Sequence, residues 1–380
     1  MRLNFALSAL LCISVIFKVQ AAPTVIEKQI ATDHHPVSLV RITDGLDQPW
    51  SVAFLPDGDM LVTEKSGRLL RISENGQKSV ITGTPAVADI GQGGLLDVAL
   101  HPDFDKNNLI YLTYSKGGKN DDVTATALAR GRLNGNRLQN LEDIFVQNIY
   151  SEPGRHYGSR IAFTQDGKIL ISVGDRGSVP LRAQDLRDHA GSVIRLNLDG
   201  TVPEDNPFVG LQNADEEIYS YGHRNIQGMV VHPETGEIWA TEHGPRGGDE
   251  LNLVKPALNY GWPVISYGRH YGRDAPFGIN THKDGMEQPV RQWTPSPAVS
   301  GLAVVSSPYF PAWNGNLLVG ALSHQSIRRV ALDGAEIKGE EILLDGLIGR
   351  IRDVRQGPDG YIYILTDQSD GGLYRLEPAQ

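Results

Sequence analysis

The chain has 380 residues, and its 45 acidic residues outnumber its 35 basic residues, which gives a net charge of −10 at pH 7. An acidic surface repels phosphate, so this charge argues against nucleic acid or an anionic membrane as the main partner. The single cysteine, Cys12, excludes an internal disulfide. Because Cys12 lies in a segment that we expect to be removed, a thiol nucleophile and a cysteine metal ligand are excluded as well.

The first 22 residues predict an export signal. Arg2 gives a positive start, residues 5–17 are apolar, and Ala21 and Ala22 supply small residues for cleavage. The apolar run is too short to cross a bilayer, although Lys18 behind it leaves an uncleaved anchor as the alternative. Removing residues 1–22 would take away two basic residues and no acidic one, so the net charge would become −12. We therefore expect a periplasmic or secreted protein without membrane insertion, with residues 23–380 forming a single catalytic domain.

One pattern recurs six times: an apolar strand, a turn rich in Pro, Asp and Gly, and a second apolar strand. The six copies begin at Ser51, Leu95, Ser159, Gly228, Leu302 and Ile351. A third strand follows most hairpins, beginning near Gly67, Ala125, Gly191, Asp249, Ser326 and Gly371.

Apolar residues at every second position and Asp-Gly turns are typical of antiparallel strands. Six such units that bury one another's faces predict an all-β fold, a six-bladed β-propeller of four-stranded antiparallel blades. The alternative is a β-sandwich whose turns happen to be evenly spaced. We expect a strand at residues 37–42 to complete the last blade and close the ring.

Propeller geometry brings distant segments together. In an up-and-down blade, the segment before the first strand and the loop between the second and third strands emerge on the same face. Four polar residues stand nine to eleven positions before the acid of the following turn: Gln92, His156, Arg224 and Arg350. The loops of that face add Glu64, Lys65, Asp175, Arg176, residues 242–245, Ser323, His324 and Asp367. We therefore predict a polar site in a concave mouth.

His156 is the only histidine among the residues before the first strands. A neutral imidazole is well suited to taking a proton near neutral pH. Asp175 follows nineteen residues later, at the end of the paired strand, where it could return beside His156 and fix its tautomer. The alternative is a histidine with a structural role only.

Arg350 and Arg352 lie two residues apart, so in a strand they would point the same way. With Arg224 from a neighbouring blade, they indicate a ligand with several carboxylates or phosphates. The alternative is ion pairing with Asp353 and other nearby acids. Because the chain has no phosphate-binding Gly-rich helix start and no Rossmann fingerprint, a multiply anionic cofactor without phosphate fits better than a nucleotide.

Two cation positions are suggested between residues 244 and 260. Asp249 and Glu250, with Tyr260, offer oxygen ligands, and the backbone at Gly244 and Pro245 offers carbonyls. Calcium prefers such an all-oxygen set, and the neighbouring glycines free the backbone to turn its carbonyls inward. The alternative is an ordinary solvated acidic turn, and no histidine-rich set suits zinc.

Several segments together resemble the soluble aldose sugar dehydrogenases of the glucose/sorbosone dehydrogenase family. They are GQGGLLDVALHPDF, HYGSRIAF, VGDRG, YGHRNIQG, EHGPRGGDELNLV, NYGWP and GRIRDVRQGPDGYIYILTD. The resemblance covers essentially all of residues 23–380. It implies a periplasmic quinoprotein with a six-bladed propeller, pyrroloquinoline quinone (PQQ) and calcium.

The resemblance also implies roles for single residues. His156 would be the general base, with Asp175 as its orienting partner. The quinone site would include Gln92, His156, Arg224, Asn225, Arg350 and Arg352, with Tyr271, Ser300 and Gly301 bordering it. Gly244 and Pro245 would offer carbonyls to the quinone-bound calcium, and Glu250 and Tyr260, with Asp249, would hold a second calcium.

One position departs from the family pattern. Relatives commonly carry a lysine after Ala-Leu or Ser-Leu in the fifth blade, aimed at the quinone, where this chain has Ser323 after Ala321 and Leu322. Loss of that cation is expected to lower the affinity for the quinone or to change its electronics. His324 and Lys65 are the candidates to replace it.

The mechanism that the resemblance implies is base-assisted hydride transfer from the anomeric carbon of an aldose to the quinone, which gives a lactone. His156 would take the hydroxyl proton, calcium would act as a Lewis acid, and Arg224 would stabilise the developing oxyanion. Electrons would pass to an external acceptor. Residues 268–286 are expected to border the sugar, and the protein is expected to be a monomer or a homodimer.

Two other functions stay open at this point. A calcium-dependent propeller hydrolase, such as a lactonase, would use the metal to activate water and needs no organic cofactor. A non-catalytic propeller would bind glycans or protein on the same face. The arginine cluster fits the hydrolase poorly.

Overall fold

The computed structural model describes residues 22–119 and 122–379. Residues 1–21, which hold nearly all of the expected signal peptide, lie outside the described part. Within the two described ranges, no helix is long and apolar enough to cross a membrane.

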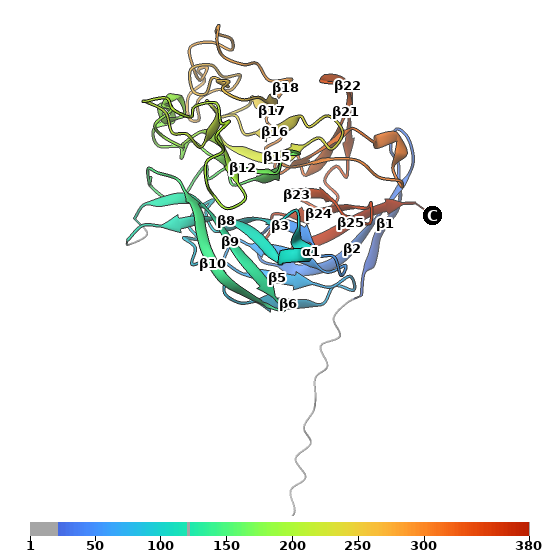
Figure 1. The fold of residues 1–380 in the computed structure, drawn as a ribbon. Coiled ribbons are helices and arrows are strands. Elements are labelled where there is room, and N and C mark those ends of the chain that lie inside the picture. Colours follow the sequence, from blue (N-terminus) through green and yellow to red (C-terminus); the bar gives the residue numbers. More distant parts are fainter. Residues whose placement is uncertain (1–21, 120–121, 380) are drawn as a thin grey trace, which may run out of the picture.

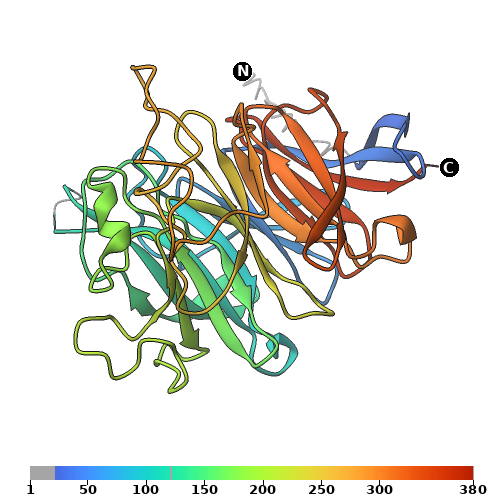
Figure 2. The same cartoon turned by 90° about the horizontal axis from the view of Figure 1, so that it is seen from above.

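The strands form six antiparallel sheets set around one axis, which confirms the predicted six-bladed β-propeller (Figures 1 and 2). Blade 1 contains β3 (Pro49–Phe54), β4 (Met60–Glu64), β5 (Leu69–Ile72) and β6 (Lys78–Ile81). Blade 2 contains β7 (Leu95–Leu100), β8 (Leu109–Gly117), β9 (Thr124–Asn134) and β10 (Arg137–Val146). Blade 3 contains β11 (Ile161–Phe163), β12 (Lys168–Val173), β13 (Ser192–Asn197) and β14 (Ile218–Tyr221).

The remaining blades follow in chain order. Blade 4 contains β15 (Ile226–Val231), β16 (Ile238–Glu242), β17 (Asp249–Val254) and β18 (Arg291–Trp293). Blade 5 contains β19 (Val299–Val304), β20 (Leu317–Ala321), β21 (Ser326–Asp333) and β22 (Glu336–Leu343). Within the described ranges, three short helices lie in the connections: α1 (Phe104–Asn107), η1 (Pro180–Gln184) and η2 (Pro311–Trp313).

Blade 6 joins the two ends of the chain. It contains β23 (Ile351–Gln356), β24 (Ile362–Thr366) and β25 (Gly371–Pro378), and then β2 (Val37–Leu46) and β1 (Thr24–Ile30) from the start of the chain. In Figure 1 the blue β2 runs beside the red β25, and Leu39 lies opposite Leu376 in their antiparallel register. The expected closing strand is therefore confirmed, and β1 adds a fifth strand that was not expected.

Burial explains why the middle strands are almost wholly apolar. Each blade is covered on both faces by its neighbours, so β4 and β20 are buried at every position. Apolar clusters accordingly combine adjacent blades, as where Leu61 of blade 1 joins Leu112 of blade 2. The fourth strands lie at the outer edge and are more exposed, as β22 shows.

Buried charges link the inner strands near the axis. Arg160 Nη1 lies 3.0 Å from a carboxylate oxygen of Asp353 and 3.6 Å from one of Asp97. Arg355 reaches the same two carboxylates, at 2.8 Å from Asp97 and 3.1 Å from Asp353. The network thus joins blades 2, 3 and 6 beneath the mouth of the propeller.

Ring closure by β2 gives a testable prediction. Leu39 is fully buried in the cluster that contains Ile364 and Leu376, so Leu39→Ala should lower the free energy of unfolding by about 2–5 kcal/mol. Val25 lies on β1 and is 47% exposed, so Val25→Ala should change it by less than about 0.5 kcal/mol. Urea unfolding followed by tryptophan fluorescence measures both. Equal effects of the two changes would show that β2 does not hold the ring closed.

Candidate active site

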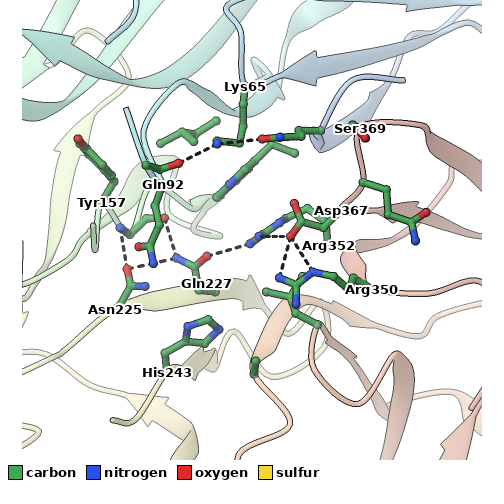
Figure 3. A pocket seen from close by; sticks show the side chains of 18 residues that line it. Lys65, Gln92, Tyr157, Asn225, Gln227, His243, Arg350, Arg352, Asp367 and Ser369 are labelled. Carbon is green, nitrogen blue, oxygen red and sulfur yellow. Dashed lines mark hydrogen bonds and ion pairs between the residues drawn. The ribbon is translucent and has the colours of Figure 1, made fainter. Parts of the chain in front are cut away.

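A cavity of about 420 Å³ opens on the axis at the mouth of the propeller (Figure 3). Loops and strand ends from blades 1 to 6 contribute to its wall. The polar side chains among its lining residues include Lys65, Gln92, Asn225, Gln227, His243, Arg350, Arg352 and Asp367. The structure therefore brings together the predicted Gln92, Asn225, Arg350 and Arg352.

The cavity wall carries more positive than negative charge. Arg350 and Arg352 share one carboxylate, Asp367, at 3.0 and 3.1 Å (Figure 3). Lys65 donates to the Gln48 side chain at 3.0 Å and to the Gly91 carbonyl at 2.8 Å, and its Nζ lies 3.8 Å from a carboxylate oxygen of Asp89, which does not line the cavity. Among the described lining residues Asp367 is the only acid. Asp353, the alternative partner for the arginines, is instead held by Arg160 and Arg355.

Two lining residues add neutral hydrogen-bonding groups. Gln227 accepts a hydrogen bond from Arg352 at 3.1 Å and donates to the Asn225 side chain at 3.2 Å. Burial lowers the pKa of His243 to about 4, so its ring is neutral and its Nε2–H donates to the Val299 carbonyl at 2.5 Å. His243 thus lines the cavity as a neutral group.

Arg224 lies beside the cavity as a buried guanidinium with one donor unpaired in the described part of the chain, its Nε–H. It precedes β15, and its Nη1 donates to the His243 carbonyl at 3.0 Å. Its Nε has no hydrogen-bond partner among the described residues, and burial lowers its pKa. An unpaired buried charge is costly, so this arrangement suits an anionic or strongly polar ligand.

His156 and Asp175 form a hydrogen-bonded pair. His156 lies in the segment before β11 and Asp175 directly after β12, and the His156 Nδ1 is 2.6 Å from a carboxylate oxygen of Asp175. The side chain of Gln92 accepts the His156 backbone N–H at 2.7 Å, which ties the pair to the cavity wall.

Electrostatics keep the pair in the form His neutral, Asp ionised. Burial lowers the pKa of His156, and the charge of Arg224 acts in the same direction, while the hydrogen bond with Asp175 opposes them. Burial alone would raise the pKa of Asp175, but its hydrogen bond with His156 and the charge of Arg224 hold that pKa below its usual value. The neutral ring therefore donates from Nδ1 and leaves Nε2 free to accept a proton.

The backbone around this pair adopts unusual conformations. His156 has φ 55° and Arg176 has φ 64°, both in the left-handed region that non-glycine residues rarely occupy. A Cβ at Gly174 would collide with the His156 carbonyl, so only glycine lets the two segments approach this closely. Such features collect at functional sites.

A second, much smaller cavity lies behind Arg224. It has a volume of about 10 Å³, the room of one water molecule or one ion. Four of the predicted metal ligands line it, together with one further carboxylate: Gly244, Pro245, Glu250, Tyr260 and Glu242. The hydroxyl of Tyr260 donates to the Leu253 carbonyl and accepts the Lys255 N–H, so any metal bond from Tyr260 would come from its backbone carbonyl.

Two carboxylates, those of Glu242 and Glu250, line this small cavity close to each other. The Asn252 amide reaches Glu250 at 3.2 Å and Glu242 at 3.5 Å. Burial and the neighbouring charge of Glu242 raise the pKa of Glu250 to about 8. A crowded pair of carboxylates with backbone carbonyls nearby suits a hard cation.

Asp249 is used differently from Glu250. Its oxygens accept hydrogen bonds from Gly244 N–H at 3.0 Å, Ser296 Oγ at 2.6 Å and Val299 N–H at 3.0 Å. It does not line the small cavity. Asp249 therefore braces the Gly244 loop against blade 5.

Six of the residues expected at the quinone site do not line the main cavity: His156, Arg224, Tyr271, Ser300, Gly301 and Ser323. Ser300 and Gly301 lie inside β19 rather than in a loop, where the Ser300 hydroxyl donates to the Ile351 carbonyl at 2.7 Å. Tyr271 is 72% exposed in the long connection before β18. Ser323 is exposed, and its hydroxyl donates to the Ser296 carbonyl at 3.1 Å.

Two residues near the pair gain roles that the sequence did not indicate. Trp262 Nε1 donates to the second oxygen of Asp175 at 2.6 Å. Glu242 accepts the Arg224 backbone N–H and lies 3.0 Å from the His223 ring. Both contacts join residues of different segments, so the only available signal was their position within the segments that resemble the family.

One cluster of metal-binding residue types lies elsewhere in the described chain, at His189, Asp215 and Glu217. His189 Nε2 is 3.5 and 3.6 Å from the two carboxylates. However, the Asn148 N–H donates to His189 Nδ1 at 3.2 Å, so the ring proton resides on Nε2. A histidine that binds a metal through one ring nitrogen donates a hydrogen bond from the other. The geometry here instead fits a protonated Nε2 that faces the two carboxylates.

Comparison with known proteins places these features in context. The Glucose / Sorbosone dehydrogenase family matches residues 46–375. The chain is 39% identical to the aldose sugar dehydrogenase YliI of Escherichia coli (strain K12), over 99% of each chain.

Solved structures agree with this match. The apo-form of the soluble aldose sugar dehydrogenase from Escherichia coli has a TM-score of 0.86 at 40% identity, covering 90% of this chain and 99% of that one. The PQQ-bound aldose sugar dehydrogenase of Streptomyces coelicolor has a TM-score of 0.75 at 26% identity, covering 94% and 98%. With its propeller, its histidine–aspartate pair and these matches, the chain belongs to the glucose/sorbosone dehydrogenase family.

Proposed function

We propose that this protein is a PQQ- and calcium-dependent dehydrogenase that oxidises aldoses at the anomeric carbon to lactones and passes the electrons to an external acceptor. Relatives named aldose sugar dehydrogenase and a PQQ-bound structural neighbour support it. The observation that carries the proposal is a neutral His156 paired with Asp175, whose chain neighbour Tyr157 and backbone partner Gln92 line a cavity in which cations outnumber carboxylates. An exported location, periplasmic or secreted, and a monomeric or homodimeric state complete the proposal.

The main cavity suits PQQ, which is a flat quinone with several carboxylates. Its volume of about 420 Å³ lies in the range of small-molecule sites. Arg350, Arg352 and Lys65 would hold carboxylates, and the amides of Gln92 and Asn225 would hold ring oxygens. Arg224 would complete the unmet hydrogen bond of its Nε–H with the same ligand. In this arrangement Lys65 supplies a cation in the absence of a lysine at Ser323.

The small cavity suits calcium. The carbonyls of Gly244 and Pro245 and the carboxylate of Glu250 would bind it, with the carbonyl of Tyr260 and the carboxylate of Glu242 nearby. These are hard oxygen donors of the kind that calcium prefers. Asp249 would support the loop through its bond to Gly244 and would not bind the ion directly.

The residues of the chain would act as follows. His156 Nε2 takes the proton of the anomeric hydroxyl, and Asp175 stabilises the imidazolium that forms. The chemistry that bound quinone and calcium supply is acceptance of the anomeric hydride at a polarised carbonyl. Arg224 would offer its unpaired Nε–H to the negative charge that develops. A hydride would thus leave the anomeric carbon and a proton would leave its hydroxyl, which is two electrons and two protons in all, and the sugar would become a lactone.

Reconstitution tests the proposal directly. Purified protein is supplied with calcium, PQQ, an aldose and an artificial dye acceptor, with each component omitted in turn. Dye reduction that requires both the quinone and the sugar is the expected result. Lactone opening without the quinone would replace the proposal with a calcium-dependent hydrolase, and no reaction under any condition would favour a non-catalytic binding propeller.

His156→Gln should lower turnover of the reconstituted enzyme by roughly 10²–10⁴-fold, because a general base contributes about that much. Binding of PQQ, measured by absorbance titration, should be unchanged. His101→Gln is the matched control, since His101 lies in the turn between β7 and β8 and accepts the Asp103 N–H. Turnover of the His156 variant equal to that of the control would remove His156 from the mechanism.

Glu250→Gln should abolish stabilisation of the protein by calcium. Calcium at about a hundred times its Kd should add about 2.7 kcal/mol to the stability of the unmodified protein, seen as a higher Tm in differential scanning fluorimetry. Glu234→Gln, in the exposed turn between β15 and β16, should keep the full calcium-dependent shift. A calcium shift that survives Glu250→Gln would place the ion elsewhere.

A further inference from the structure

Trp262 occupies a fixed position between blades 3 and 4. It follows β17 in the long connection to β18, and it is 6% exposed. Its backbone N–H donates to the Gly222 carbonyl at 2.8 Å, and its carbonyl accepts the Gln184 side-chain amide at 2.7 Å. The indole ring is therefore anchored through its own backbone on both sides.

The indole N–H completes the hydrogen bonding of the Asp175 carboxylate. One oxygen of Asp175 bonds to the His156 Nδ1 at 2.6 Å and accepts the Gly177 N–H at 2.8 Å. The other oxygen accepts the Trp262 Nε1–H at 2.6 Å. With donors on both oxygens, the carboxylate cannot turn about its own axis without breaking a charge-assisted hydrogen bond.

The same ring touches the other side of the site. The guanidinium carbon of Arg224 lies 5.2 Å from the centroid of the indole ring, within the range of a cation–π contact. The Phe277 ring stacks on the indole with centroids 4.6 Å apart and an interplanar angle of 25°. Phe277 belongs to residues 268–286, the segment that was expected to border the sugar.

We propose that Trp262 is a positioning residue for the His156–Asp175 pair, whose N–H holds the carboxylate in the orientation that fixes the His156 ring for proton transfer. The part of this proposal that concerns turnover rests on the dehydrogenase function proposed above. The part that concerns the histidine ring does not, because it is a property of the protein without quinone.

The direction of the effect follows from the charges around His156. The carboxylate of Asp175 favours the imidazolium, whereas the charges of Arg224 and Arg155 oppose it. Without the Trp262 N–H, the Asp175 carboxylate loses one stabilising donor and attracts a proton on His156 more strongly. The His156 ring should therefore become more basic, and its orientation less well fixed.

Trp262→Phe tests the proposal, because it removes the N–H and keeps an aromatic ring beside Arg224 and Phe277. In the protein without quinone, ¹⁵N NMR titration of the histidine rings should show the His156 pKa moving upward by on the order of half a pH unit. The His156→Gln spectrum assigns the signal. In the reconstituted enzyme, kcat should fall about tenfold, as for loss of one hydrogen bond to a charged group, with KM for the sugar nearly unchanged.

Trp293→Phe is the matched control. Trp293 is also buried, and its Nε1–H donates to a carboxylate, Glu340, at 3.1 Å. This change should cost similar stability without moving the His156 titration or kcat. Phe277→Leu gives a second reading if Trp262→Phe does not fold, because it keeps the N–H and loosens the ring; a smaller upward shift is expected.

The outcomes separate the two proposals. If Trp262→Phe lowers only the Tm and leaves the His156 titration where Trp293→Phe leaves it, the positioning role is overturned. If Trp262→Phe does not fold and Phe277→Leu leaves the titration unmoved, it is overturned as well. If the titration moves but the unmodified protein oxidises no sugar, the positioning role stands and the dehydrogenase function fails.

Discussion

The candidate site depends on six inner strands that meet around one axis, because its side chains lie on segments that end at that axis. Contacts run from β3 to β7, on through β11, β15, β19 and β23, and back to β3. Near the axis the carboxylates of Asp97 and Asp353 hold Arg160 between them. Buried ion pairs add little net stability, since desolvation offsets their attraction. We interpret this network as fixing which inner strands meet and their relative positions along the axis. The cavity above the network follows from that arrangement.

The charge of the main cavity is opposite in sign to the net charge of the whole chain. The chain as a whole has a net charge of −10, yet Lys65, Arg350 and Arg352 face the main cavity against a single described carboxylate, Asp367. Carboxylates instead gather at the small cavity behind Arg224, where Glu242 and Glu250 approach the same Asn252 amide. Arg224 lies between these two regions. An anion in the main cavity and a cation in the small cavity would neutralise both groups of charges, which is why the quinone and calcium are proposed together.

Much of the fold could be predicted because the sequence patterns of its strands and turns are local. Each blade repeats an apolar strand, a turn rich in Pro, Asp and Gly, and a second apolar strand, and the third strands carry the same alternation. The fourth strands have no shared pattern: β18 is RQW and β22 is EIKGEEIL. They lie at the outer edge, where only one side pairs and no face needs to be continuously apolar. β1, exposed at nearly every position, was missed for the same reason.

The site was predictable to the extent that blade geometry is regular. Counting back from the turn acids located Gln92, His156, Arg224 and Arg350, because equivalent offsets meet at the axis. The same reasoning could not find Trp262, whose bond to Asp175 joins residues 87 positions apart through an irregular connection. It also could not show that β19 begins at Val299, which places Ser300 and Gly301 within a strand. Nor does any periodic pattern fix residues 268–286, where Tyr271 lies exposed.

Equilibrium binding of PQQ tests most directly whether the cations of the main cavity bind one multiply anionic ligand. Calcium-loaded protein without quinone is titrated with PQQ and followed by absorbance at low and high salt. We expect saturation at one quinone per chain, with an affinity that weakens as salt screens the arginines and lysine and that falls further in Arg352→Gln. Absence of saturable binding, or binding that Arg352→Gln and salt leave unchanged, would contradict it.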